Sequence, residues 1–115
     1  MNDTTAKPAV LADESELDAF LDDHDRALVE FYTEGCGICA SMEPVLGIVA
    51  RETDTAVALV NPRDDPVLVE RFDVRSVPTL VLFEDGEQVG RVADGFLGAD
   101  EVLAFVDDET ASGSD

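Results

Sequence analysis

Cys36 and Cys39 are the only cysteines of this 115-residue chain, and two residues separate them. Sulfurs at this spacing can close a disulfide, or both can bind a metal ion. Cys36 follows an apolar run at residues 27–32 and a turn at residues 33–35, and a helical pattern begins with it. A helix start stabilises a thiolate through its macrodipole and its free backbone N–H groups. The predicted chemistry is thiol–disulfide exchange, in which Cys36 attacks a substrate disulfide and Cys39 resolves the mixed disulfide.

Two other interpretations of the cysteine pair compete with exchange. The thiols could be small buried hydrophobic side chains, although random placement rarely puts both at this spacing, after a strand and at a helix start. CxxC is also a zinc-binding motif, and a structural zinc site needs four ligands. His24 is the only histidine, so one chain cannot complete such a site from cysteine and histidine. A dimer that shares two CxxC pairs could, and a non-catalytic interaction module also stays open.

The hydrophobic pattern changes its period several times along the chain. Apolar runs predict a short edge strand at residues 9–11 and longer strands at residues 27–32, 55–61, 79–83 and 88–92. Helical spacing predicts helices at residues 13–23, 36–52, 67–72 and 99–106. Asp85 and Gly86 favour a hairpin between the last two strands. Parallel strands joined by helices, followed by a hairpin and a covering helix, make an α/β sandwich.

The predicted elements fill residues 9–108, a length that suits one domain with its own core. We expect residues 1–8 and 109–115 to be flexible tails. No stretch approaches the roughly 20 apolar residues that span a bilayer. The first eight residues have neither the basic region nor the apolar region of a secretory signal, so we expect a cytoplasmic protein.

The charge balance is strongly acidic, with 27 acidic residues against seven basic ones and a formal net charge of −20. Such a surface repels nucleic acid and anionic membranes, so neither is an expected partner. The acids recur between the apolar runs, and Lys7 is the only lysine. An evenly acidic, lysine-poor surface resembles that of proteins from halophilic microbes, whose molar salt shortens the Debye length to about 3 Å. We therefore expect a halophilic source.

The chain resembles the thioredoxin family over nearly its whole length. The resemblance rests on Leu28-Val29-Glu30-Phe31-Tyr32, on Cys36-Gly37-Ile38-Cys39 followed by Pro44, on Val77-Pro78-Thr79 and on Asp85-Gly86. It implies the thioredoxin fold, a central mixed β-sheet flanked by helices on both faces. It also implies an enzyme, a thiol–disulfide oxidoreductase, with no metal and no cofactor beyond the Cys36–Cys39 disulfide. We expect the reductase type, and a more oxidising thiol oxidase or isomerase is the alternative. The implied partners are disulfide-containing substrate proteins and a thioredoxin-reductase-type electron donor. We expect the chain to be a monomer.

The resemblance also implies roles for residues around the cysteines. Glu30 stands where the family has a buried aspartate that accepts the proton of Cys39. An unpaired carboxylate is costly in a central strand, which favours this role over that of an acid at a strand edge in contact with water. Pro78 is implied to follow a cis peptide bond that turns the backbone of Val77 toward a bound peptide. The implied substrate-binding residues are Gly35, Gly37, Ile38, Val77, Pro78 and Gly95.

Several positions near the cysteines depart from the family pattern. Gly35 replaces the usual tryptophan, and Ile38 replaces the usual proline. Ala40 replaces the usual lysine or arginine, and Leu59 stands where a lysine often neighbours the buried acid. The surface around the cysteines is therefore expected to be less aromatic and less basic than in a general-purpose family member.

Overall fold

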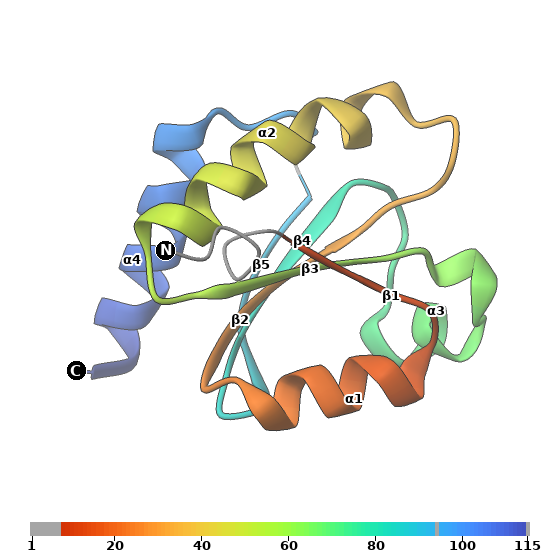
Figure 1. Cartoon of the computed structure of the whole chain (residues 1–115), viewed down its shortest axis with the longest axis horizontal. Coiled ribbons are helices and arrows are strands. Elements are labelled where there is room, and N and C mark those ends of the chain that lie inside the picture. The colour runs from red at the N-terminus through yellow and green to blue at the C-terminus, as the bar shows by residue number, and fades with distance from the viewer. Residues whose placement is uncertain (1–7, 94, 115) are drawn as a thin grey trace.

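One five-stranded sheet forms the centre of the molecule (Figure 1). The structure is a computed structural model that describes residues 8–93 and 95–114. Its strands are β1 (Ala9–Leu11), β2 (Arg26–Phe31), β3 (Ala56–Val60), β4 (Thr79–Glu84) and β5 (Glu87–Val92), in the sheet order β1-β3-β2-β4-β5. β1 and β2 run parallel to β3, whereas β4 runs antiparallel to β2 and β5. The sheet is therefore mixed, as expected, and the predicted edge strand is confirmed.

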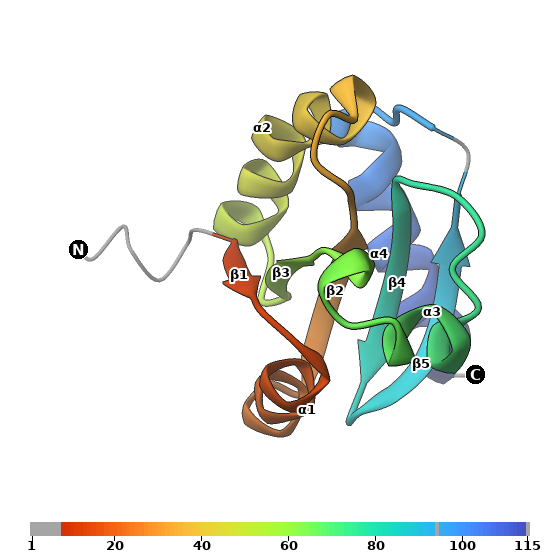
Figure 2. The same ribbon diagram turned by 90° about the vertical axis from the view of Figure 1, so that its right-hand side faces the viewer.

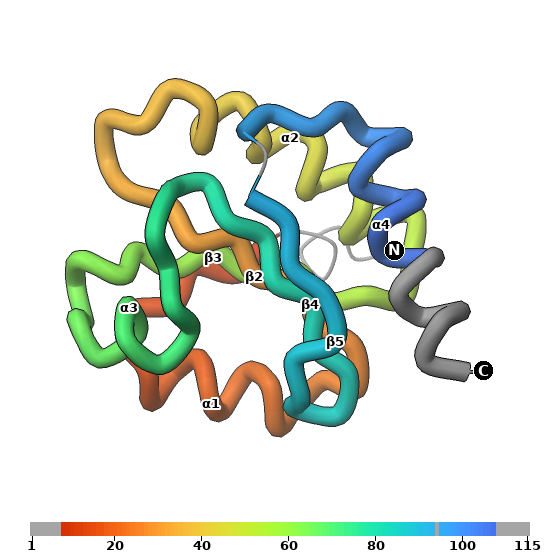
Figure 3. Tube along the Cα trace, turned by 180° about the vertical axis from the view of Figure 1, so that it is seen from behind, coloured from red at the N-terminus to blue at the C-terminus, as the bar shows by residue number. Residues whose placement is uncertain are grey.

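Helices cover both faces of the sheet (Figure 2). They are α1 (Glu14–Asp23), α2 (Gly37–Glu52), α3 (Val67–Phe72) and α4 (Ala99–Ser114), with the short 3-10 helix η2 (Pro62–Asp64) before α3. Seen from behind, α1 and α3 lie on one side of the sheet and α2 and α4 on the other (Figure 3). In the described part of the chain, no helix combines the length and apolar content that crossing a membrane requires.

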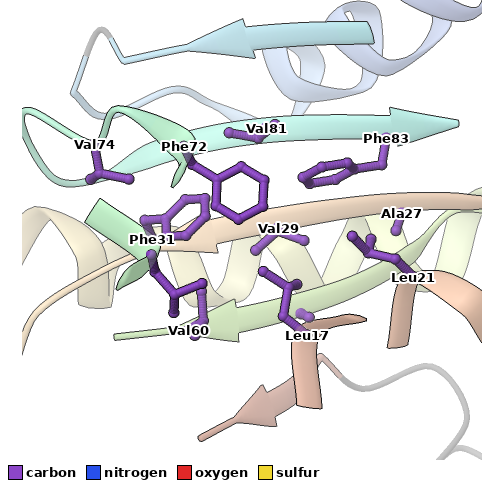
Figure 4. Packing of buried hydrophobic residues seen from close by; sticks show 12 residues of the cluster. Leu17, Leu21, Ala27, Val29, Phe31, Val60, Phe72, Val74, Val81 and Phe83 are labelled. Carbon is purple, nitrogen blue, oxygen red and sulfur yellow. The ribbon is translucent and has the colours of Figure 1, made fainter. Parts of the chain in front are cut away.

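The first core lies between the sheet and the pair α1 and α3 (Figure 4). At its centre the ring of Phe72 contacts those of Phe31 and Phe83, with centroids 5.5 and 5.7 Å apart. The other buried members are Leu17, Leu21, Ala27, Val29, Ala58, Val60, Leu68, Val74 and Val81. This core fixes β2, the strand that leads into the cysteine pair.

The second core lies between the opposite face of the sheet and the pair α2 and α4. Its buried members are Leu28, Met42, Val45, Leu46, Val49, Val57, Leu59, Leu80, Leu82, Val102 and Val106. Successive residues of a strand point to opposite faces, so Glu30, two residues after Leu28, points into this second layer. One carboxylate therefore lies on the side of α2, the helix that carries the cysteine pair.

Local signals set several of the element ends. Asp13 caps α1, because its Oδ1 accepts a hydrogen bond from the Glu16 N–H at 2.9 Å. Asp85 and Gly86 have φ angles of 53° and 83°, the left-handed pair that a two-residue hairpin turn needs, so the predicted hairpin is confirmed.

The C-terminal helix is longer than expected. α4 is helical as far as Ser114, whereas the sequence placed the end of the domain at residue 108 and a flexible tail after it. No proline interrupts residues 109–114, and Ala111 favours a helix, so the helical backbone continues. Residues 1–7 and 115 of the expected tails lie outside the described residues.

Candidate functional site

The cysteine pair lies at the junction between β2 and α2. The chain turns at Gly35, whose φ of +85° lies in the left-handed region that glycine tolerates. Cys36 then caps α2, one residue before the first helical turn in which the sequence placed it. Its Sγ accepts a hydrogen bond from the Cys39 N–H at 3.1 Å. A thiolate at this position gains both that N–H and the positive end of the helix dipole.

Cys36 and Cys39 form a disulfide, with their Cα atoms 5.3 Å apart. The two residues differ in their access to a partner. Cys36 is half-buried, whereas Cys39 lies inside the first turn of α2 and is only 3% exposed. Cys39 is therefore shielded from large partners, and a large substrate can reach Cys36 more readily.

Glu30 is 1% exposed, in the middle of the central strand β2. Its register partners are Leu59 on β3 and Leu80 on β4, which provide no counter-charge. Its Oε2 makes no hydrogen bond with any described residue. Burial, and secondarily the nearby Glu43 carboxylate, raise the pKa of Glu30 from 4.5 to about 8. The expected buried position is confirmed, and the alternative of an acid at a strand edge is wrong.

One cavity brings the predicted catalytic residues together. It has a volume of about 260 Å³, and we call it the cysteine pocket. Its lining consists of Glu30, Tyr32, Thr33, Glu34, Gly35, Cys36, Cys39, Ala40 and Glu43. The sequence interpretation missed Glu34 and Glu43 as members of the site. Glu43 carried a usable signal, because it follows Cys39 by four residues on the same helix and so shares its face.

The peptide bond between Val77 and Pro78 is cis, as the family resemblance implied. Val77 lines a second cavity, together with residues of η2, α3 and the loop before β4. Thr33 belongs to both this cavity and the cysteine pocket. The backbone that precedes Pro78 therefore lies beside the turn that leads into Cys36.

Three other predicted residues line neither cavity. Gly37 and Ile38 are exposed at the start of α2, and the Ile38 side chain is 47% exposed. Gly95 has a φ of +88° and lies in the segment between β5 and α4. That segment contacts α2, because the Leu97 N–H donates to Sδ of Met42 at 3.4 Å.

Comparisons with known proteins agree with this geometry. The family model described as Thioredoxin matches residues 8–108. A thioredoxin of Chlamydia caviae is 36% identical over 80 residues, which are 69% of this chain and 78% of that protein. The structure of a mutant thioredoxin from Halobacterium salinarum NRC-1 is 38% identical and superposes with a TM-score of 0.85, covering 92% of this chain and 93% of that one. The chain therefore belongs to the thioredoxin family and is a thiol–disulfide oxidoreductase with the thioredoxin fold.

Proposed function

We propose that the chain reduces protein disulfides, with Cys36 as the nucleophile, Cys39 as the resolving thiol and Glu30 as the proton acceptor. The observation that carries this proposal is the cysteine pocket, which joins a buried carboxylate to an accessible and a shielded sulfur. The N-cap position of Cys36 supports its role, because hydrogen bonding to the helix start favours the thiolate.

The reduced protein would act in two exchange steps. The Cys36 thiolate attacks one sulfur of the substrate disulfide, a new S–S bond forms, and the other substrate sulfur leaves as a thiolate that takes a proton from water. Cys39 then passes its proton to Glu30 and attacks Sγ of Cys36. The second substrate sulfur leaves and is protonated. The substrate gains two electrons and two protons, and the Cys36–Cys39 disulfide forms.

A substrate segment would bind across the surface beside Cys36. The backbone of Val77, next to Pro78, would pair with it as a neighbouring strand does. Gly35, Gly37, Ile38 and Gly95 would border the same segment. The exposed side chain of Ile38 and the contact of the Gly95 segment with α2 support this placement.

The oxidised protein needs a source of electrons, for which we infer a thioredoxin-reductase-type partner protein. The sulfurs carry the electrons, so the reaction requires no bound metal or cofactor. Among the described residues, no group of three or more histidine, cysteine, aspartate or glutamate side chains is arranged to hold a metal ion. We propose a monomer that acts in the cytoplasm.

Turnover on a protein disulfide tests the proposed function. With dithiothreitol as reductant, the chain is expected to speed the reduction of a protein that has an accessible disulfide, and free thiols report the rate. Redox titration against glutathione gives the direction of electron flow. A rate equal to that of dithiothreitol alone would identify an interaction module instead. Zinc bound at half an equivalent per chain, together with a dimer in sedimentation, would identify the metal-bridged form.

We also infer that the protein works at high salt. With seven basic residues against 27 acidic ones, the carboxylates cannot each have a basic partner of their own. Arg71 already contacts both Glu14 and Asp18, and Arg75 contacts Asp73. The remaining negative charges repel one another across a molecule whose extents are 32 × 30 × 27 Å. At 0.01 M salt the Debye length of about 30 Å matches that size.

The melting temperature is expected to rise by about 10 °C or more between 0.01 M and 2 M potassium chloride at pH 7, a shift that corresponds to about 2 kcal/mol. Salt screens the repulsion that the folded chain concentrates and that unfolding relieves. Thermal unfolding of the oxidised protein checks this expectation. A melting temperature that stays constant or falls with salt contradicts the halophilic source and leaves the redox function untouched.

A further inference from the structure

The cysteine pocket is lined by acidic side chains and by no basic side chain. Glu30, Glu34 and Glu43 all line it, and no lysine, arginine or histidine does. Position 40, at the lining, is alanine, and Leu59 lies next to Glu30 in the sheet. The three carboxylates therefore have no positive counter-charge inside the pocket.

Glu30, the most deeply buried of these carboxylates, also lacks a hydrogen bond at one of its oxygens. Oε2 of Glu30 is buried and has no hydrogen-bond partner among the described residues. A buried oxygen without a partner calls for a physical explanation, and a group that enters the pocket and completes its hydrogen bonding is one such explanation. The neighbouring strands offer only Leu59 and Leu80, and the charged or titratable groups that share the pocket are Glu34, Glu43, Tyr32, Cys36 and Cys39. None of these groups is a cation.

We propose that the cysteine pocket receives the ammonium or guanidinium group of a lysine or arginine that lies beside the reacting cysteine of the substrate protein. The proposal rests on the proposed function, because the substrate must first be joined to Cys36. Cys36 lines the pocket, so a residue next to the attached substrate cysteine lies within reach of it. A cavity of about 260 Å³ holds several water molecules of about 30 Å³ each, which leaves room for an extended lysine side chain.

The bound cation has a consequence for the second exchange step. Glu34 and Glu43 are exposed and meet the cation at the pocket entrance, while Glu30 gains a counter-charge. A nearby positive charge favours the ionised form of a carboxylate. Ionised Glu30 is the form that accepts the Cys39 proton. A basic residue of the substrate therefore favours the form of Glu30 that is needed to release the substrate from its mixed disulfide with Cys36.

Two disulfide-bridged peptides that differ in one residue test the proposal. The residue beside one cysteine is lysine in the first peptide and norleucine, of the same chain length, in the second. Each rate is divided by the rate of the same peptide with dithiothreitol alone, which corrects for the effect of the charge on the disulfide itself. The corrected kcat/KM is expected to be about fivefold higher for the lysine peptide, which is the gain that a partly exposed ion pair can give. The pH at which resolution is half-maximal is expected to be lower for it.

Variants distinguish the effect of the pocket carboxylates from the effect of the overall negative charge of the protein. Combined Glu34→Gln and Glu43→Gln substitutions are expected to remove the preference for lysine. Glu52→Gln, at the exposed far end of α2, removes the same kind of charge outside the pocket and is expected to keep the preference.

Several results would overturn the proposal. Equal corrected rates for the two peptides would do so, as would a preference that survives in the double variant. Methylammonium chloride that raises the norleucine rate to the lysine rate would show a site for free cations instead. Failure of the wild-type protein to reduce either peptide would reject the proposed function itself. Equal corrected rates for the two peptides would reject only the proposal that the pocket receives a lysine or arginine side chain.

Discussion

Cys36→Ser is expected to abolish disulfide reduction, whereas Cys39→Ser is expected to accumulate a mixed disulfide with the substrate. The first variant lacks the accessible sulfur that begins the reaction. The second keeps that sulfur but lacks the shielded thiol that releases the substrate. Mass spectrometry under non-reducing conditions detects the trapped species as the mass of the chain plus that of one substrate.

The two serine variants are well matched as controls for the fold. A serine at position 36 can still cap α2, because its hydroxyl oxygen accepts the hydrogen bond that the Cys39 N–H now donates to sulfur. Loss of activity in Cys36→Ser therefore does not require loss of the helix start, and circular dichroism checks this. Equal trapping by both variants, or by neither, contradicts the assignment of the two roles.

Local chemistry explains why most of the fold was predictable. The apolar run at Ala9–Leu11, the cap at Asp13 and the turn at Asp85 and Gly86 are each recognised from residues within a few positions of one another. The short apolar run at residues 27–32 likewise predicted that Glu30 lies in a buried strand. These signals are encoded in propensities, caps and periodicity, so a single sequence contains them.

The missing parts of the site depend on contacts between elements. Thr33 borders two cavities because η2 and the loop before β4 pack beside the turn after β2, which no short pattern encodes. The effect of Glu43 on Glu30 likewise requires α2 to lie across β2. The sequence could place Glu43 on the face of Cys39, but it could not show that two carboxylates share one pocket.

Glu30→Gln is expected to stabilise the oxidised protein relative to wild type, and increasingly so as the pH rises from about 4.5 to 8. Over this range the unfolded wild-type chain releases the Glu30 proton, while the folded chain, whose Glu30 pKa is raised to about 8, retains it. The unfolded state then binds fewer protons, so wild-type stability falls as the pH rises. Each pH unit corresponds to about 1.4 kcal/mol, or on the order of 5 kcal/mol in all. Glutamine does not titrate and avoids this loss.

Denaturant unfolding of both proteins between pH 4 and 9, at one potassium chloride concentration, measures the effect. The repulsion among the other acids also changes with pH, but it is common to both proteins and cancels in the difference. Glu52→Gln, which removes an exposed carboxylate, is the matched control and is expected to show a small difference at every pH. A difference for Glu30→Gln that does not depend on pH would show that Glu30 titrates alike in the folded and unfolded chains.

The same substitution separates a proton acceptor from a residue that only fills space. Glu30→Gln is expected to slow release of the substrate from the Cys36 mixed disulfide, and to leave the first attack by Cys36 nearly unchanged. In wild type the resolution rate is expected to rise with pH, to be half-maximal near pH 8 and to level off above it, since only ionised Glu30 accepts the Cys39 proton. Rapid mixing of reduced protein with a disulfide peptide resolves the two steps. If the variant resolves the mixed disulfide at the wild-type rate and with the wild-type pH dependence, Glu30 is structural, and Cys39 gives its proton directly to water.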